Sequence, residues 1–79
     1  KSMLGHTMGA AAALEAIVCC LALRNQEIPP TINLSEQSLD CKIDCVPGKG
    51  RAHKIKVVLN NSQAFGGNNA VVSFIVVLN

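Results

Sequence analysis

The 79-residue chain is 49% hydrophobic and 15% charged, with a formal net charge of +2. It is too apolar for a disordered protein and too weakly basic to suggest binding to nucleic acid. A chain of this length makes at most one small domain and buries only roughly 60% of its unfolded surface. Its charge content is also low for an independent small domain, which needs a mostly polar surface. The composition therefore indicates a piece of a larger core, or a chain that buries itself against a partner.

The first predicted element is a helix from Thr7 to about Asn25, which follows a loop over residues 1–6. The Thr7 hydroxyl is the expected N-cap. The other faces of this helix carry Ala and Cys rather than charge, so the pattern predicts a buried helix. Its apolar stripe recurs at spacings of three and four residues: Ala10, Leu14, Ile17, Val18 and Leu21.

The second half of the chain predicts a hairpin. Pro29 and Pro30 end the helical pattern, and residues 35–53 are expected to be mostly loop. Polar and apolar residues alternate in "HKIKVVLNN", which predicts a strand with one polar face. In "AVVSFIVVL" (70–78), residues at both odd and even positions are apolar, which predicts a strand buried on both faces. The turn "SQAFGGNN" joins them. The expected fold class is α/β, a buried helix followed by an antiparallel β-hairpin, with no complete independent domain.

Neither a secretory signal nor a membrane span is expected, because no run reaches the roughly 18–20 apolar residues that a span needs. The four cysteines, Cys19, Cys20, Cys41 and Cys45, are expected to be reduced thiols of a cytoplasmic protein. Cys41 and Cys45 with His53 fit no strong zinc spacing, so no metal is expected.

Basic residues cluster between Lys49 and Lys56, with no aromatic residue among them on which a base could stack. A solvated face is the favoured interpretation. If this cluster binds anything, an acidic protein surface is the better candidate.

Lys1 and His6 are the first candidate functional pair. A neutral imidazole next to a helix N-terminus can hold a developing oxyanion, and a lysine adds fixed positive charge. Spacing alone fits ordinary surface residues equally well. Glu15, which is the acid of the predicted helix, is either simply exposed or paired with Lys1.

The second candidate is "AFGGNN" (64–69). Its two glycines permit backbone conformations that could aim N–H groups at a ligand. The alternative is a hairpin turn that merely needs positive φ.

Three blocks occur in a specific order: "KSMLGHTMGAAAALEA", "IPPTINL" and "NSQAFGGNN". Their sequence and spacing resemble the C-terminal end of the β-ketoacyl-acyl carrier protein (ACP) synthases, and most closely the 3-oxoacyl-ACP synthase II type. These are the condensing enzymes of fatty acid and polyketide synthesis. The resemblance covers essentially the whole chain. It implies a thiolase-like fold in the parent enzyme, with residues 1–79 as the C-terminal segment of the C-terminal ketoacyl synthase domain.

The resemblance also implies roles for individual residues. Lys1 and His6 match the active-site lysine and the second active-site histidine, and Glu15 matches an acid that supports the lysine. Phe65 matches the gate of the acyl pocket, and its N–H contributes to the oxyanion hole. The turn that positions this gate corresponds to Gly66, Gly67 and Asn69.

The chain departs from the family pattern near the gate. Ala12 stands where Gly is usual, and Gln63-Ala64 stands where Phe-Gly is usual. Asn68 replaces a common Thr. If the position of Ala64 needs positive φ, this residue is expected to strain the gate loop.

By resemblance, the parent enzyme is an acyltransferase of fatty acid or polyketide synthesis that works without a cofactor. Its partners would be ACP and malonyl-ACP, with the nucleophilic Cys supplied by the remainder of the synthase and a homodimer as the expected assembly. Its location would be the cytoplasm, or a plastid or mitochondrion in a eukaryote. The alternative is a noncatalytic truncated module with a structural or partner-binding role. A longer reading frame upstream of Lys1 would favour the enzyme.

Overall fold

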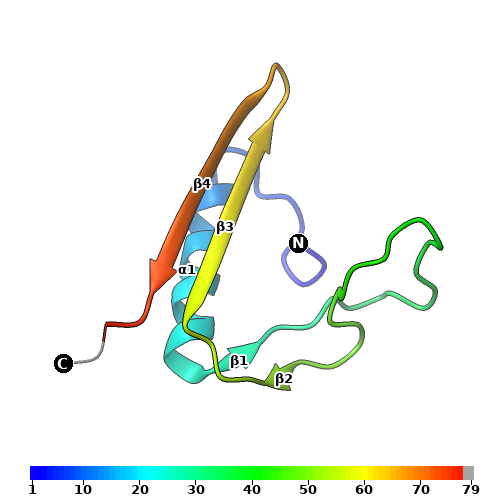
Figure 1. Ribbon diagram of the computed structural model, residues 1–79. Coiled ribbons are helices and arrows are strands. Elements are labelled where there is room, and N and C mark those ends of the chain that lie inside the picture. The colour runs from blue at the N-terminus through cyan, green and yellow to red at the C-terminus, as the bar shows by residue number, and fades with distance from the viewer. Residues whose placement is uncertain (78–79) are drawn as a thin grey trace.

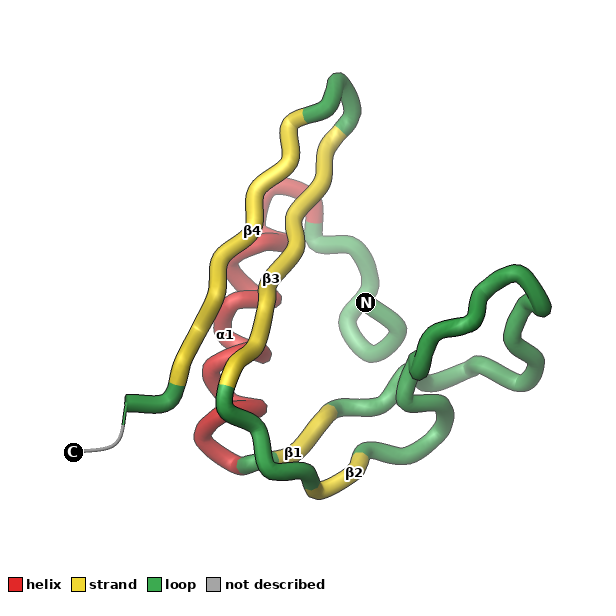
Figure 2. Tube along the Cα trace, in the orientation of Figure 1, coloured by secondary structure: helices red, strands yellow, loops and turns green. Residues whose placement is uncertain are grey.

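The computed structural model describes residues 1–77 and consists of one helix packed along one face of a β-hairpin (Figure 1). The two predicted elements, a helix followed by an antiparallel hairpin, are confirmed. The loops between them extend away from the hairpin (Figure 2). The elements in chain order are η1 (Met8–Ala10), α1 (Ala11–Asn25), β1 (Glu27–Ile28), β2 (Arg51–Ala52), β3 (Val57–Ala64) and β4 (Asn68–Ile75).

The helix begins with a short 3-10 turn rather than with a capped α-turn. The carbonyl oxygen of Thr7 accepts a bond from the N–H of Ala10 at 3.1 Å, but the Thr7 hydroxyl makes no capping bond. Thr7 has φ −91° and ψ 25°, outside the extended conformation that directs a cap hydroxyl at the first turn. The predicted Thr7 cap is therefore wrong.

The end of the helix is fixed by Gln26. This residue adopts the left-handed conformation at φ 55°, and its N–H donates to the carbonyl of Ala22. Its side chain donates to the carbonyls of Leu23 at 2.6 Å and Ile55 at 3.0 Å, while its oxygen accepts from the N–H of Ile55 at 2.7 Å. One side chain thus joins the C-terminus of α1 to the segment that leads into β3.

β3 and β4 pair antiparallel from Val57 opposite Ile75 to Ala64 opposite Asn68. The strands extend further toward the turn than the sequence predicted, so the turn itself is only residues 65–67. Gly66 and Gly67 adopt φ values of +88° and +81°, which side chains disfavour. Residue 78 of the predicted second strand lies outside the described residues.

Ala64 is the last residue of β3 and is absent from the residues with positive φ. The strain expected at this position is therefore wrong. The left-handed backbone falls instead on Gly66 and Gly67, two and three residues after Ala64.

One face of the hairpin packs against α1, and a polar side chain lies in the contact. Asn60 is 7% exposed, and its Nδ2 donates to the carbonyl of Ala12 at 3.1 Å. Val72 lies opposite Asn60 in the ladder, and Phe74 lies opposite Val58, so these residues share the face that meets the helix.

The opposite face of the hairpin is uncovered. Its four large aliphatic side chains, between 52% and 63% exposed, are Val57, Leu59, Val71 and Ile75. The chain exposes 6507 Å², whereas a folded protein of 8.3 kDa is expected to expose about 4,600 Å². Within the described residues, Cys19 and Asn60 are the buried ones. The burial predicted for the helix and for β4 is thus not supplied by this chain, and it stays a prediction for a larger assembly.

The helical segment Met8–Asn25 spans 18 residues with a mean hydropathy of 1.4, which is long and apolar enough to cross a membrane. The expectation that no segment reaches this length needs correction. The core helix of a soluble protein passes the same test. Glu15 carries a charge within the segment, and the Asn60 side chain donates to the carbonyl of Ala12, so the segment is not uniformly apolar.

Candidate active site

A cleft of about 740 Å³ lies between the N-terminal segment and the tip of the hairpin. It is lined from the start of the chain by Lys1, His6 and Glu15, and from the hairpin by Phe65 and Asn69. Phe65 stands 50 positions after Glu15, the last residue of the first group. The structure therefore brings five of the seven candidate residues to one cavity.

Lys1 and Glu15 form an ion pair in this cleft. Nζ of Lys1 lies 2.7 Å from Oε1 of Glu15, which is the pairing that the resemblance implied. The hydrogen bond from Lys1 lowers the pKa of the Glu15 carboxyl below its ordinary value, against the opposing effect of partial burial. The carboxylate thus stays ionised and holds the ammonium group in place.

The backbone of the N-terminal segment is folded into a turn that presents Lys1. The N–H groups of Leu4 and Gly5 both donate to the Lys1 carbonyl, at 3.2 Å and 2.7 Å. The Ser2 hydroxyl accepts from the N–H of Ile32 at 2.9 Å, which ties this turn to the segment after β1. These contacts position the start of the chain without help from regular secondary structure.

His6 is exposed in the loop that leads into η1. Two residues later Met8 has φ 53°, a left-handed conformation that is uncommon for a residue with a side chain. Among residues 1–77, the His6 side chain makes no hydrogen bond to the protein, so both ring nitrogens can face a molecule in the cleft.

Phe65 is fully exposed at the hairpin tip, and it lines the cleft. Gly66 and Gly67 form the turn but do not line the cavity, whereas Asn69 does. The interpretation of "AFGGNN" as a hairpin turn that needs positive φ is confirmed, whereas a role of its N–H groups in binding a ligand stays a prediction. The hairpin requires positive φ at the two glycines, and the same turn presents Phe65 to the cleft.

Sequence reasoning missed the polar lining supplied by the strands. It consists of Asn61, Ser62, Gln63 and Asn68. Alternation marks these residues as strand positions, but only the packing of α1 against β3 shows that they share a cavity with Lys1 and His6. The sequence feature that could have indicated this lining is the run of polar residues on either side of the hairpin turn.

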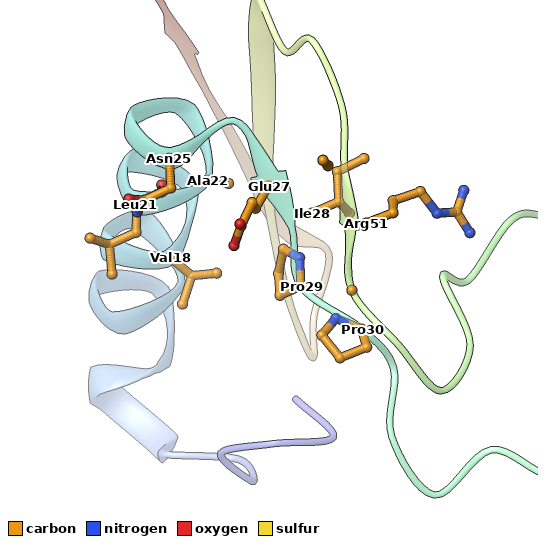
Figure 3. Close-up of a pocket in the computed structure, with 11 residues that line it drawn as sticks. Val18, Leu21, Ala22, Asn25, Glu27, Ile28, Pro29, Pro30 and Arg51 are labelled. Carbon is orange, nitrogen blue, oxygen red and sulfur yellow. Dashed lines mark hydrogen bonds between the residues drawn. The ribbon is translucent and has the colours of Figure 1, made fainter.

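A second groove of about 420 Å³ lies between the end of α1 and the β1–β2 pair (Figure 3). Its walls are mostly apolar, with Val18 and Leu21 on the helix and Pro29 and Pro30 opposite. Arg51 borders it, but its guanidinium is directed away from the helix and pairs with Asp44. The groove thus lacks a cluster of reactive groups, and the larger cleft remains the candidate site.

Comparison with known proteins finds similar sequences over most of the chain. Residues 1–35 match the model of the β-ketoacyl synthase C-terminal domain. The chain is 51% identical over 70 residues to a 3-oxoacyl-[acyl-carrier-protein] synthase 2 of Rhizobium meliloti, covering 89% of the chain and 17% of that protein. It is 47% identical over 74 residues to the synthase 2 of Mycobacterium leprae, covering 94% of the chain and 18% of that protein.

Solved structures give the same result. The fold matches the ishigamide ketosynthase/chain length factor with a TM-score of 0.87 and 54% identity, over 90% of this chain and 18% of that one. It also matches a type II polyketide ketosynthase in complex with its acyl-carrier protein, with a TM-score of 0.82 and 35% identity, over 86% of this chain and 17% of that one.

The fold and sequence are thus similar to one segment of the ketoacyl synthases. The chain belongs to the β-ketoacyl synthase family, and the curated relatives named above are 3-oxoacyl-ACP synthases 2. The chain spans less than a fifth of the length of these relatives.

Proposed function

We propose that the chain is the C-terminal segment of a ketoacyl synthase domain that elongates an acyl chain with malonyl-ACP by a decarboxylating Claisen condensation. The product would enter fatty acid or polyketide synthesis. The observation that carries this proposal is the cleft, because it joins Lys1, His6 and Phe65 from opposite ends of the chain.

The chemistry of the reaction suits these groups. Loss of carbon dioxide from a malonyl thioester leaves an enolate, whose negative charge rests on the thioester oxygen. His6 would donate a hydrogen bond to that oxygen, because a preorganised donor in a cleft stabilises developing charge. Lys1 would add positive charge, with Glu15 as the positioning residue that holds it. Phe65 would gate the acyl pocket, and its N–H would contribute to the oxyanion hole.

The nucleophile that carries the acyl group would come from the remainder of the synthase. Within residues 1–77, no cysteine lines the cleft. Cys19 is buried, and burial raises the pKa of its thiol, which disfavours the reactive thiolate. Loading of the acyl group would therefore use a cysteine from the remainder of the synthase, whereas stabilisation of the enolate would use His6 and Lys1 of this chain.

ACP and malonyl-ACP are the proposed partners, and a homodimer is the proposed assembly. The support for ACP is the similarity to a type II polyketide ketosynthase solved in complex with its acyl-carrier protein. A cytoplasmic location is proposed from the bacterial relatives.

The test compares the two histidines of the chain in the full-length protein. His6→Ala should lower condensation of acyl-ACP with malonyl-ACP about 100- to 1,000-fold, the usual effect of losing one oxyanion donor. His53→Ala is the matched control, since His53 is exposed and does not line the cleft. Equal activities of the two variants would reject the site. Absence of condensation in the unmodified full-length protein would favour a noncatalytic module.

A further inference from the structure

Asn60 places an amide in the contact between α1 and the hairpin. It is 7% exposed, and its Nδ2 donates to the carbonyl of Ala12 at 3.1 Å, across 48 residues of sequence. Its neighbours on this face of the hairpin, Val58 and Phe74, are apolar. A buried amide gives up its hydrogen bonds to water, and a directed bond within the protein offsets that loss. An apolar side chain would fill the same position without this cost, so the amide points to a role beyond packing.

The bond joins the two walls of the cleft. Ala12 lies in the first turn of α1 and lines the cleft, six residues after His6. Asn61, which follows Asn60 on β3, also lines the cleft, and the same strand leads to the tip that carries Phe65. The bond therefore fixes the spacing between the wall that carries His6 and the wall that carries Phe65.

A second attachment between the helix and the hairpin lies far from the cleft. The side chain of Gln26, the C-cap of α1, bonds to the backbone of Ile55 at 3.0 Å and 2.7 Å. Ala12 and Gln26 are 14 residues apart, which is about 21 Å along a helix. Loss of the Asn60 bond thus leaves the hairpin attached by side-chain hydrogen bonds at the far end, and lets it shift at the end that borders the cleft.

We infer that Asn60 is a positioning residue for carbon–carbon bond formation, an inference that rests on the proposed function. Its bond to Ala12 keeps the two walls of the cleft aligned. The enolate at His6 is then within reach of the acyl thioester at the Phe65 N–H. The enolate carbon forms a bond to the acyl carbonyl carbon, and the thiolate of the nucleophilic cysteine leaves.

Misalignment of the walls changes which product forms. Carbon dioxide still leaves malonyl-ACP, because His6 and Lys1 both belong to the N-terminal wall. An enolate that does not reach the acyl group takes a proton from water and gives acetyl-ACP. The ratio of acetyl-ACP to condensed product therefore measures the alignment of the two walls. Partial unfolding lowers the amounts of both products and leaves their ratio unchanged.

The experiment measures this ratio in the full-length protein, with acyl-ACP and with malonyl-ACP that is radiolabelled in its methylene carbon. Asn60→Val removes the donor and suits a strand face that already carries Val58 and Val72. Asn60→Ala removes the donor without adding bulk. Each variant should raise the ratio about 10- to 100-fold, since a displacement of about 1 Å can cost up to about 100-fold in rate. Gln26→Ala, the matched control at the far attachment, should leave the ratio unchanged.

Three results would overturn the inference alone. The first is an unchanged ratio in both Asn60 variants while the unmodified protein condenses normally. The second is a rise in Asn60→Ala without one in Asn60→Val, which would assign the effect to lost volume. The third is an equal rise in Gln26→Ala, which would indicate general loosening of the hairpin. Absence of condensation in the unmodified protein would instead reject the proposed function, and the inference with it.

Discussion

Leu59→Ala tests whether the open face of the hairpin is covered by another layer in the full-length protein. Leu59 is 57% exposed in this chain and shares its face with Val57, Val71 and Ile75. If nothing covers that face, less than half of the side chain is buried. The substitution should then lower the free energy of unfolding by about 1 kcal/mol or less. If a second layer covers it, the loss should be about 2–5 kcal/mol, the range for buried leucines.

The assay is urea unfolding of the full-length protein, followed by fluorescence and circular dichroism. Leu39→Ala provides the matched control, because Leu39 is 91% exposed in a loop and its substitution should change the free energy of unfolding by no more than about 0.5 kcal/mol. We expect the larger loss for Leu59→Ala. Equal losses in the two variants would refute the inference that this surface belongs to a larger core.

Three further predictions follow from contacts in the chain. Gln26→Ala should lower the free energy of unfolding of the full-length protein by about 1.5–3 kcal/mol, because it removes three hydrogen bonds. Gln26→Gly should cost less because glycine accepts the left-handed backbone, and urea unfolding measures both. Because the Glu15 pKa is lowered from its ordinary 4.5, the ion pair with Lys1 stabilises the fold above that pH, and this contribution is lost as the pH falls through the lower folded value. When melting temperature is measured against pH, Glu15→Gln should remove the part of its fall at acidic pH that comes from this ion pair. The same dependence on pH in the variant and the unmodified protein would contradict the prediction. The isolated 79 residues should take up no acyl group and should self-associate in light scattering, since uncovered β-branched strands pair with copies of themselves; a cooperative transition from a dilute monomer would contradict this.

The order of elements was predictable from the sequence because it depends on local pattern. Pro29 and Pro30 cannot continue a helix, and the alternation before "FGG" is typical of a strand that enters a turn. The strand ends were misjudged because Asn and Gln near a turn read as loop residues. In the structure they pair across the hairpin, so backbone pairing overrides their low strand propensity.

The contacts that join the elements could not be predicted. Nothing in the local pattern indicates that Gln26 bonds to Ile55, 29 residues away, or that Asn60 reaches the Ala12 carbonyl. The Thr7 cap was misjudged for a related reason, since the backbone before the helix takes a 3-10 path that sequence alone does not fix.

Local pattern named Lys1, His6 and the glycine turn only as candidates, and the resemblance gave them their expected roles. A lysine, a histidine and a glycine turn are each common on protein surfaces. What distinguishes them here is that the fold brings Lys1, His6 and Phe65 to one cleft. That convergence depends on α1 lying along the hairpin with its N-terminus toward the tip (Figure 1).

The most direct test of the central claim separates the two half-reactions in the full-length His6→Ala protein. Radiolabelled acyl-enzyme formation measures loading of the proposed nucleophilic cysteine, and carbon dioxide release from malonyl-ACP measures decarboxylation. We predict that loading stays within a few-fold of the unmodified protein while carbon dioxide release falls about 100- to 1,000-fold, because only the second step forms an enolate that needs this donor. Equal decreases in both steps would show a structural role for His6, and no decrease in either would place His6 outside the active site.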